Sequence, residues 1–275
     1  MTVKVFAPAK INLTLHVTGQ RADGYHLLDS LVVFADVGDQ VMVSKGVGLA
    51  LEVHGGEAEG VPTGPENSIL QAAQMMGCDD LAFRLEKNLP TAAGIGGGTA
   101  DAAAAVRGIS EIYDVAVPDD LAQLGADVPV CMRKSATRMS GIGEVLQDLP
   151  PMPPLYAVLV NPRVTVSTPA VFKALKSRNN EAMPDRIPAF NTAGDLTEWL
   201  ADQRNDLQAA AIGVQPVISN VLKELNGLGG LLIARMSGSG ATCFGLFKTA
   251  ENATTAASNL SEMHPDWWVQ ATRFS

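Results

Sequence analysis

A glycine-rich segment is the part of this sequence whose residue types most directly predict chemistry. Residues 89–101 read Leu-Pro-Thr-Ala-Ala-Gly-Ile-Gly-Gly-Gly-Thr-Ala-Asp, and four of the five residues from Gly94 to Gly98 are glycine. Four alanines, residues 102–105, follow directly, and alanine is the best helix former. A glycine loop that leads into a helix N-terminus presents free N–H groups and the positive end of the helix dipole, so it predicts an anion site, with phosphate as the commonest ligand.

This loop matches neither of the two familiar phosphate-binding motifs. The Walker motif needs a Gly-Lys pair, which the sequence does not contain. The dinucleotide motif G-x-G-x-x-G starts at Gly94 and Gly96 but meets Thr99 at its last position. The alternative to phosphate binding is a tight turn where a helix crosses a strand closely.

Two charged residues are candidates for catalysis, and each has a plainer interpretation. Lys10 lies in an apolar segment, where it is either on the solvated face of an edge strand or a fixed cation that stabilises charge developing on an oxygen. Asp127 follows Gly125 and precedes Pro129, a pattern typical of a helix N-cap. In an apolar wall the same carboxylate would be a general base or would orient a hydroxyl, as in kinases that phosphorylate alcohols. Asn12 shares the strand face with Lys10.

Two further segments carry weaker signals. Tyr25 and His26 follow a turn, and an aromatic ring beside an imidazole either stacks on and hydrogen-bonds a base or packs within a strand. The segment Ser-Gly-Ser-Gly, residues 237–240, lies between two predicted strands. It is either a hairpin loop or a second glycine platform near phosphate.

Strands and helices must position these residues. In the first half, alternation and turn signals predict strands over 3–17, 27–37, 40–44 and 81–86, and helices over 67–76, 99–113 and 119–124. Four prolines in residues 149–154 mark a boundary. Beyond it we expect strands over 155–160, 231–236, 242–247 and 267–274, and helices that begin near 167–169, 194 and 205 or cover 216–225 and 252–260. This order predicts an α+β fold with two lobes, residues 1–150 and 151–275.

Composition bounds the class of protein. The chain has 275 residues, of which 47% are hydrophobic and 18% charged, as in folded globular proteins. No apolar run is long enough for a membrane helix, and the N-terminus is too short in apolar residues for a signal peptide, so we expect a cytoplasmic protein without a membrane partner. The net charge of −9 argues against a general nucleic-acid partner. Three widely spaced cysteines argue against a zinc site and against a disulfide framework.

Taken together, five segments resemble a known family of enzymes. They are Pro8–Leu13, Asp23–His26, Leu89–Ala102, Gly125–Pro129 and Ser237–Ala241. In this order they resemble the GHMP kinase superfamily, from Lys4 to about Phe247. The Pro-Ala-Lys-Ile-Asn-Leu, Gly-Tyr-His and Gly-Ala-Asp-Val-Pro segments point, within it, to the kinases of 4-diphosphocytidyl-2-C-methyl-D-erythritol.

The resemblance implies a fold and a reaction. The fold is the two-lobed α+β fold of GHMP kinases, with the active site in the cleft between the lobes. ATP, accompanied by Mg²⁺, donates its γ-phosphate to the 2-hydroxyl of 4-diphosphocytidyl-2-C-methyl-D-erythritol, in the non-mevalonate route to isoprenoids. One alternative is another GHMP kinase, acting on homoserine or mevalonate. The Gly-Tyr-His and Gly-Ala-Asp-Val-Pro segments argue against it. The other alternative is a non-catalytic nucleotide-binding homologue, and the presence of both Lys10 and Asp127 argues against that.

The resemblance also implies roles for individual residues. Lys10 and Asp127 match the catalytic pair. The expected ATP-binding residues are Asn67, Lys87, Pro90, Gly94, Ile95, Gly96, Gly97, Gly98, Thr99 and Ala100. The expected substrate-binding residues are Asn12, Tyr25, His26, Thr168, Pro169 and Phe172, with cytosine between the Tyr25 and Phe172 rings, and Gly238, Ser239 and Gly240 form a second loop near phosphate.

Two departures from the family pattern bear on the site. Thr99 stands where the family usually has serine, and its hydroxyl is the one expected contact to Mg²⁺, with no other metal ligand assigned. The segment before Asp127 is several residues shorter than usual, which puts the packing behind this aspartate in question.

Overall fold

A computed structural model describes all residues, Met1–Ser275. The chain forms two compact units. Unit 1 consists of Met1–Lys10, Val37–Thr91 and Gly96–Arg133, and unit 2 of Ile11–Asp36, Ala92–Ile95 and Lys134–Ser275. The predicted division at residue 150 does not match these units, because two long strands, β1 (Thr2–Asn12) and β3 (His26–Lys45), each contribute to both. The expected α+β class is confirmed.

The first prediction to fail concerns β3. The two strands predicted over 27–37 and 40–44 form one strand, because β3 continues through Gly38 and Asp39 without a turn. A Cβ at Gly38 would lie 2.3 Å from the Ala7 carbonyl oxygen, so glycine is needed for the close approach of β1, not for a turn. Asp39 is fully buried, and its Oδ1 accepts hydrogen bonds from the backbone N–H groups of Asn88 and Leu89 at 2.6 and 2.9 Å. The predicted strand over 3–17 likewise divides into β1 and β2 (His16–Gln20).

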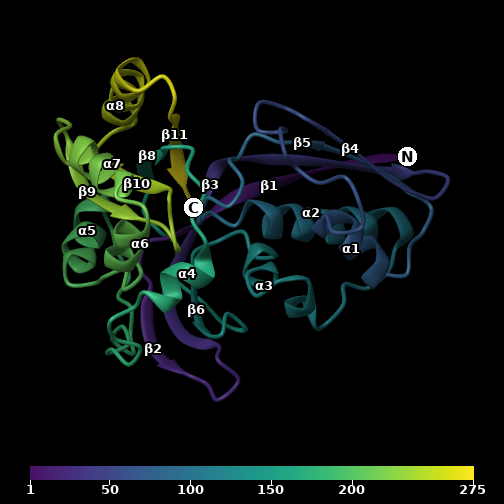
Figure 1. The fold of residues 1–275 in the computed structure, drawn as a ribbon, viewed down its shortest axis with the longest axis horizontal. Helices are drawn as coiled ribbons and strands as arrows, with labels where there is room; N and C mark the ends of the chain where they lie inside the picture. Colours follow the sequence, from purple (N-terminus) through teal and green to yellow (C-terminus); the bar gives the residue numbers. More distant parts are fainter. The chain divides into compact units, whose positions relative to one another are not determined.

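Unit 1 combines a small sheet with helices. The second part of β3 pairs antiparallel with β5 (Leu81–Glu86), which pairs parallel with β4 (Leu49–His54). The helices α1 (Ser68–Met75) and α2 (Gly97–Tyr113) pack side by side (Figure 1). The 3-10 helix η1 (Leu121–Leu124) and the short α3 (Val128–Cys131) follow. The predictions for α1, α2 and β5 are confirmed to within two residues at each end, whereas β4 was not predicted.

Unit 2 contains a larger antiparallel arrangement. At its centre β8 (Leu155–Asn161) pairs with β11 (Trp268–Phe274) on one side and with β10 (Cys243–Phe247) on the other, and β10 pairs with β9 (Leu231–Met236). Phe274 of β11 pairs with Ala35 of β3. The first part of β3 pairs with β2 and with β6 (Thr137–Gly141), and β6 pairs with β7 (Val145–Asp148). β6 and β7 were not predicted.

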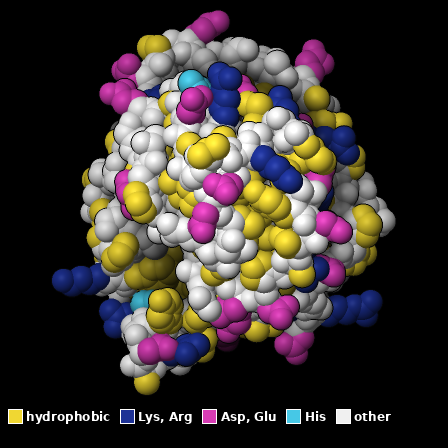
Figure 2. Space-filling model, turned by 90° about the vertical axis from the view of Figure 1, so that its right-hand side faces the viewer, with side chains coloured by type: hydrophobic (Ala, Val, Ile, Leu, Met, Phe, Trp, Pro, Cys, Tyr) yellow, Lys and Arg dark blue, Asp and Glu magenta, His cyan; other side chains and the backbone are white.

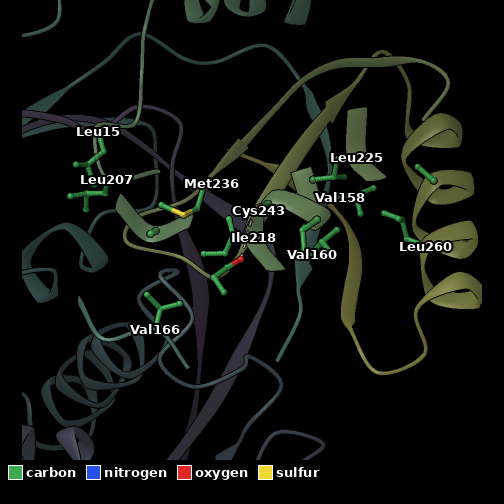
Figure 3. Packing of buried hydrophobic residues seen from close by; sticks show 14 of the residues in the cluster. Leu15, Val158, Val160, Val166, Leu207, Ile218, Leu225, Met236, Cys243 and Leu260 are labelled. Carbon is green, nitrogen blue, oxygen red and sulfur yellow. Dashed lines mark hydrogen bonds between the residues drawn. The ribbon is translucent and has the colours of Figure 1, made fainter. Parts of the chain in front are cut away.

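The helices of unit 2 bury one face each. They are α4 (Thr168–Lys173), α5 (Ala193–Ala201), α6 (Gln208–Val214), α7 (Val217–Asn226) and α8 (Ala250–Met263). On α7 the buried residues Ile218, Val221 and Leu225 follow helical spacing. Figure 3 shows Ile218 and Leu225 packed with strand residues of one continuous core, among them Val160 and Cys243.

Every helix of the structure is too short or too polar to span a lipid bilayer. On the face drawn in Figure 2, acidic and basic side chains are interspersed and basic side chains do not gather into one patch.

All three cysteines are free. Burial raises the pKa of the Cys131 thiol to about 12, so this thiol stays protonated and is a poor nucleophile.

Candidate active site

The structure pairs the two predicted catalytic residues. Lys10, near the end of β1, and Asp127, directly before α3, belong to unit 1, and the Lys10 Nζ lies 2.9 Å from the Asp127 Oδ2. The Lys10 side chain is 5% exposed and that of Asp127 is 33% exposed. Asp127 occupies the N-cap position but makes no side-chain capping bond. Both plainer interpretations are therefore wrong, since Lys10 is not on a solvated face and the Asp127 carboxylate binds an ammonium instead of capping the helix.

This ion pair lies beside the start of α2. A Cβ added at Gly96 would be 3.2 Å from the Lys10 Cβ. Gly96 is the N-cap of α2, with a left-handed backbone (φ 67°) and no side-chain capping bond. The Thr99 hydroxyl donates to the Gly96 carbonyl at 2.8 Å. The first N–H groups of a helix have no intrahelical acceptor, so the start of α2 offers donors for an anion next to the Lys10–Asp127 pair.

Within unit 2, the first part of the glycine-rich loop, at Ala93 and Gly94, packs against the second glycine loop, residues 237–240, and against Thr242. A Cβ at Gly94 would be 2.7 Å from the carbonyl oxygens of Ser237 and Gly240. The Ser237 hydroxyl donates to the Gly94 carbonyl at 3.1 Å, and the Thr242 N–H donates to the Ala93 carbonyl at 3.1 Å. Gly94 is therefore required by close backbone packing, in agreement with the alternative of a tight turn. The start of α2, by contrast, has the geometry of an anion site.

Lys87 does not present its ammonium to solvent. Its Nζ donates to the Asp101 Oδ2 at 2.9 Å and to the Asp39 Oδ2, and all three side chains are buried. A Cβ at Gly97 would lie 3.1 Å from the Lys87 Nζ, so this cluster is directly under the first turn of α2. Sequence reasoning missed Asp39 and Asp101. A signal existed for Asp101, since it is the one charged residue in the alanine-rich first half of a helix.

The other predicted ATP-binding residues have structural roles in unit 1 or in the loop. Asn67 caps α1, because its Oδ1 accepts from the Ile69 N–H at 2.9 Å, and its Nδ2 donates to the Pro62 carbonyl at 2.7 Å. The side chains of Pro90, Ile95 and Ala100 are buried. Contacts of these residues to a nucleotide stay predictions, and any phosphate contact from Gly96 to Ala100 has to come from backbone N–H groups or from the Thr99 hydroxyl.

The structure brings two of the predicted base-binding residues together, while the binding of cytosine between the Tyr25 and Phe172 rings stays a prediction. The ring of His26, not that of Tyr25, stacks on Phe172, with centroids 4.5 Å apart and planes at 23°. Tyr25 is 59% exposed. The His26 Nε2 is buried and has no hydrogen-bond partner. Burial, and secondarily the positive charge of Arg178, lowers the pKa of His26, so its ring is neutral at pH 7.

The remaining predicted substrate residues are linked to the second glycine loop within unit 2. The Asn12 backbone N–H donates to the Ser237 Oγ at 3.0 Å, and its side-chain amide donates to the Ser30 Oγ at 2.7 Å. The Thr168 and Ser239 hydroxyls are 2.8 Å apart. Pro169 lies in the first turn of α4, where proline costs no hydrogen bond.

The same loop has a support that sequence reasoning missed. Asn205 donates its side-chain amide to the Gly238 carbonyl at 2.9 Å and to the Met236 carbonyl at 2.8 Å. Its own Oδ1 accepts from the Leu207 N–H at 3.0 Å. No local pattern marks this asparagine, because its partners lie on a distant part of the chain.

The residues present fit a magnesium ion that arrives with a nucleotide. No group of three or more His, Cys, Asp or Glu side chains is arranged to hold a metal ion. Mg²⁺ usually keeps several waters and binds through substrate phosphates and one or two carboxylates, so a closed protein cage is not required. The side-chain oxygens beside the start of α2 include the Asp127 carboxylate and the Thr99 hydroxyl.

Comparison with known families and curated proteins gives consistent results. The model described as "GHMP kinases N terminal domain" matches residues 67–144, and the one described as "GHMP kinases C terminal" matches residues 186–266. A curated protein of Dinoroseobacter shibae named 4-diphosphocytidyl-2-C-methyl-D-erythritol kinase is 60% identical, over 97% of this chain and 93% of its own. A protein of the same name from Cereibacter sphaeroides is 51% identical, over 99% of both chains.

Solved structures agree in fold. A crystal structure of 4-(cytidine 5'-diphospho)-2C-methyl-D-erythritol kinase superposes with a TM-score of 0.75 and 30% identity, covering 99% of both chains. A homoserine kinase from Cytophaga hutchinsonii reaches a TM-score of 0.65 at 20% identity, covering 98% of this chain and 94% of its own, which shows a shared fold only. This chain is a GHMP kinase and belongs to the 4-diphosphocytidyl-2-C-methyl-D-erythritol kinase family.

Proposed function

We propose that this protein transfers the γ-phosphoryl group of ATP to the 2-hydroxyl of 4-diphosphocytidyl-2-C-methyl-D-erythritol, a step of the methylerythritol phosphate route to isoprenoid precursors. The observation that carries the proposal is the Lys10–Asp127 ion pair of 2.9 Å beside the uncapped start of α2. The substrate is inferred from the names of the two curated relatives. Because the phosphoryl donor is ATP, we place the reaction in the cytoplasm.

Asp127 is proposed to hold the acceptor hydroxyl and take its proton. As the new P–O bond forms at the substrate oxygen, the bond between the γ-phosphorus and the bridging oxygen breaks and ADP leaves. Lys10 compensates the Asp127 carboxylate and the charge that develops on the transferred group. Phosphoryl transfer depends mainly on positioning and electrostatics, which a buried lysine held by an ion pair supplies without reorganisation.

The start of α2 is proposed to bind the ATP phosphates. Backbone N–H groups of residues 97–99 are free of intrahelical partners by the geometry of a helix, and the helix dipole favours negative charge there. Mg²⁺, when bound, neutralises phosphate charge, and the Thr99 hydroxyl and the Asp127 carboxylate are the side chains proposed to hold it.

His26 and Phe172 are proposed to bind the cytosine. Phe172 offers a ring for stacking, and stacking tolerates every base. The unpartnered His26 Nε2 is buried, and a buried nitrogen without a partner favours a ligand that completes its hydrogen bond. Because His26 already stacks on Phe172, we assign a secondary role to Tyr25, which is 59% exposed.

The acceptor is tested by measuring ADP release with a panel of alcohols. The enzyme with ATP and Mg²⁺ is assayed with 4-diphosphocytidyl-2-C-methyl-D-erythritol, homoserine, mevalonate or no acceptor. We expect ADP release to depend on the cytidyl substrate. Faster ADP release with homoserine or mevalonate would favour the alternative GHMP kinases. Binding of ATP without ADP release for any acceptor would favour a non-catalytic homologue.

A His26→Ala substitution is expected to reduce base discrimination. An unmatched buried polar group costs about 1–3 kcal/mol, so removing the His26 hydrogen bond should narrow the cytidine-to-uridine preference by about tenfold. Competition between the cytidine substrate and its uridine analogue measures the ratio. The matched control is Tyr25→Ala, which should weaken both analogues alike. An unchanged ratio in His26→Ala would return His26 to a packing role.

A Gly97→Val substitution is expected to weaken nucleotide binding. The new Cβ would stand 3.1 Å from the Lys87 Nζ and displace either that lysine or the first turn of α2. ATP affinity should fall by about tenfold or more, the loss that 1.4 kcal/mol produces, while the cytidyl ligand still binds. Calorimetry with each ligand tests this. Gly213→Val is the control, since a Cβ at Gly213 meets nothing within 4 Å. Normal ATP affinity in folded Gly97→Val would contradict the loop assignment.

A further inference from the structure

The part of the chain around α4 carries positive charge without any negative charge. Residues 149–180 contain no Asp or Glu, and their charged residues are Arg163, Lys173, Lys176 and Arg178. The chain as a whole has a net charge of −9. A local excess of cations in an acidic protein raises the local concentration of anions, so it favours an anionic ligand at this place.

The last residues of this basic segment are held at both ends beside the proposed cytosine site. At one end, the Phe172 ring of α4 stacks on the His26 ring. At the other end, Asn180 donates its backbone N–H and its side-chain amide to the Val17 carbonyl at 3.0 and 3.1 Å. Val17 lies on β2, which pairs with the part of β3 that begins at His26. Residues 173–179 therefore run past the β2–β3 hairpin close to His26.

Arg178 is the cation of this segment whose charge acts on His26. Burial, and after it the positive charge of Arg178, lowers the pKa of His26. The Arg178 side chain is exposed, and neither a hydrogen bond nor an ion pair engages its guanidinium. A guanidinium has five N–H donors, so that of Arg178 is available to an anion that binds beside His26.

Three other arginines around the β2–β3 hairpin already have carboxylate partners. The pairs are Arg21–Asp23, Arg138–Asp29 and Arg204–Asp206, each with 2.7 Å between a nitrogen and a carboxylate oxygen. Their charge is largely balanced within the protein. Arg178 differs from them, because its charge has no such partner.

The chemistry of the proposed acceptor fits this free arginine. In 4-diphosphocytidyl-2-C-methyl-D-erythritol only the ribose separates the cytosine from the first phosphate. Cytosine bound at His26 and Phe172 therefore brings a diphosphate into the surroundings of His26, where Arg178 acts. Guanidinium groups bind phosphate oxygens through two parallel N–H···O bonds. The same charge also offsets the repulsion between the diphosphate and an acidic protein.

We propose that Arg178 binds the diphosphate of the cytidyl substrate and that it selects cytidine ligands with phosphate over cytidine itself. This inference rests on the proposed function, since it assumes that cytosine binds at His26 and Phe172. It adds a residue for the diphosphate, a part of the substrate that the proposed function leaves without a contact.

Steady-state kinetics of Arg178→Gln, at saturating ATP and Mg²⁺, test the contact. We expect the KM for the cytidyl substrate to rise by roughly fivefold to tenfold, the loss of an exposed but charge-assisted contact. The kcat and the KM for ATP should stay within about twofold of wild type, because the contact is equally strong in the ground state and the transition state. Arg178→Lys should lose less, since lysine keeps the charge without the paired N–H groups.

Two further readouts separate phosphate binding from a packing role. Added sodium chloride should raise the KM of wild type more than that of Arg178→Gln, because salt screens an exposed charge pair. Cytidine, which has the base but no phosphate, should bind both proteins equally, as measured by saturation-transfer NMR, which detects weak ligands. Arg84→Gln, at an exposed arginine on β5 of unit 1, is the charge-matched control and should behave as wild type.

The possible failures point to different parts of the account. A KM of Arg178→Gln within about twofold of wild type would overturn this inference and leave the proposed function standing. Equal weakening of cytidine and of the cytidyl substrate would also overturn it, since Arg178 would then support the base site by packing. Absence of ADP release from wild type with the cytidyl substrate would overturn the proposed function and the inference with it.

Discussion

An Asp127→Asn enzyme is expected to lose roughly two to four orders of magnitude of kcat, the range that general acid–base catalysis contributes. The amide keeps the size of the carboxylate but cannot take a proton from the acceptor hydroxyl. Asp127 is one-third exposed and makes no capping bond, so the substitution leaves α3 and the fold intact. Steady-state kinetics should therefore show a large loss in kcat with little change in KM for the cytidyl substrate.

Asp119→Asn provides the matched control, because Asp119 is an exposed aspartate on the segment that leads to η1. It should retain the activity of wild type. An Asp127→Asn enzyme within about threefold of the wild-type kcat would exclude the proposed role, since general base catalysis contributes far more than that.

The second large effect is expected from Lys10→Met. Methionine fills the buried space of the lysine stem but removes the ammonium that contacts Asp127. Loss of one positioned charge at a transferring group typically lowers kcat by roughly 10²–10³-fold. Because Lys10 and Asp127 act as a unit, the double variant should lose little more than the worse single variant.

Lys4→Met on the same strand is the control, since Lys4 is exposed. Rapid-quench measurement of a single turnover separates the chemical step from binding and product release. A Lys10→Met enzyme with an unchanged single-turnover rate, or a double variant whose losses multiply fully, would show that the two residues act separately.

The sequence predicted elements whose signals are local. Asn67 before an apolar helical pattern marked the start of α1, and the alanine run marked α2. The failure at Gly38 and Asp39 has a tertiary cause. Both residue types favour turns, but Gly38 is required by the approach of β1, and Asp39 is satisfied by two distant backbone N–H groups. Pairing partners of this kind are invisible in a local window.

The candidate site shows the same limit. Local pattern alone favoured a solvated Lys10 and a capping Asp127, and only the family resemblance joined them; the structure then placed them 2.9 Å apart. The buried group of Lys87, Asp39 and Asp101 escaped prediction because each member has an ordinary local interpretation. Asp39 lies between two predicted strands, Lys87 was expected beside a nucleotide, and Asp101 lies on a helix. Their association depends on the packing of β3, β5 and α2, which no spacing in the chain encodes.

NMR of the product, with ³¹P and ¹³C detection, tests most directly whether the phosphoryl group is transferred to the 2-hydroxyl. Incubation of the enzyme with ATP, Mg²⁺ and 4-diphosphocytidyl-2-C-methyl-D-erythritol should yield one new phosphomonoester, coupled to the carbon that bears the 2-hydroxyl, with one ADP for each product. The same incubation with Asp127→Asn should yield almost none. A phosphomonoester on another carbon, or ADP formation without any phosphorylated cytidyl product, would contradict the account.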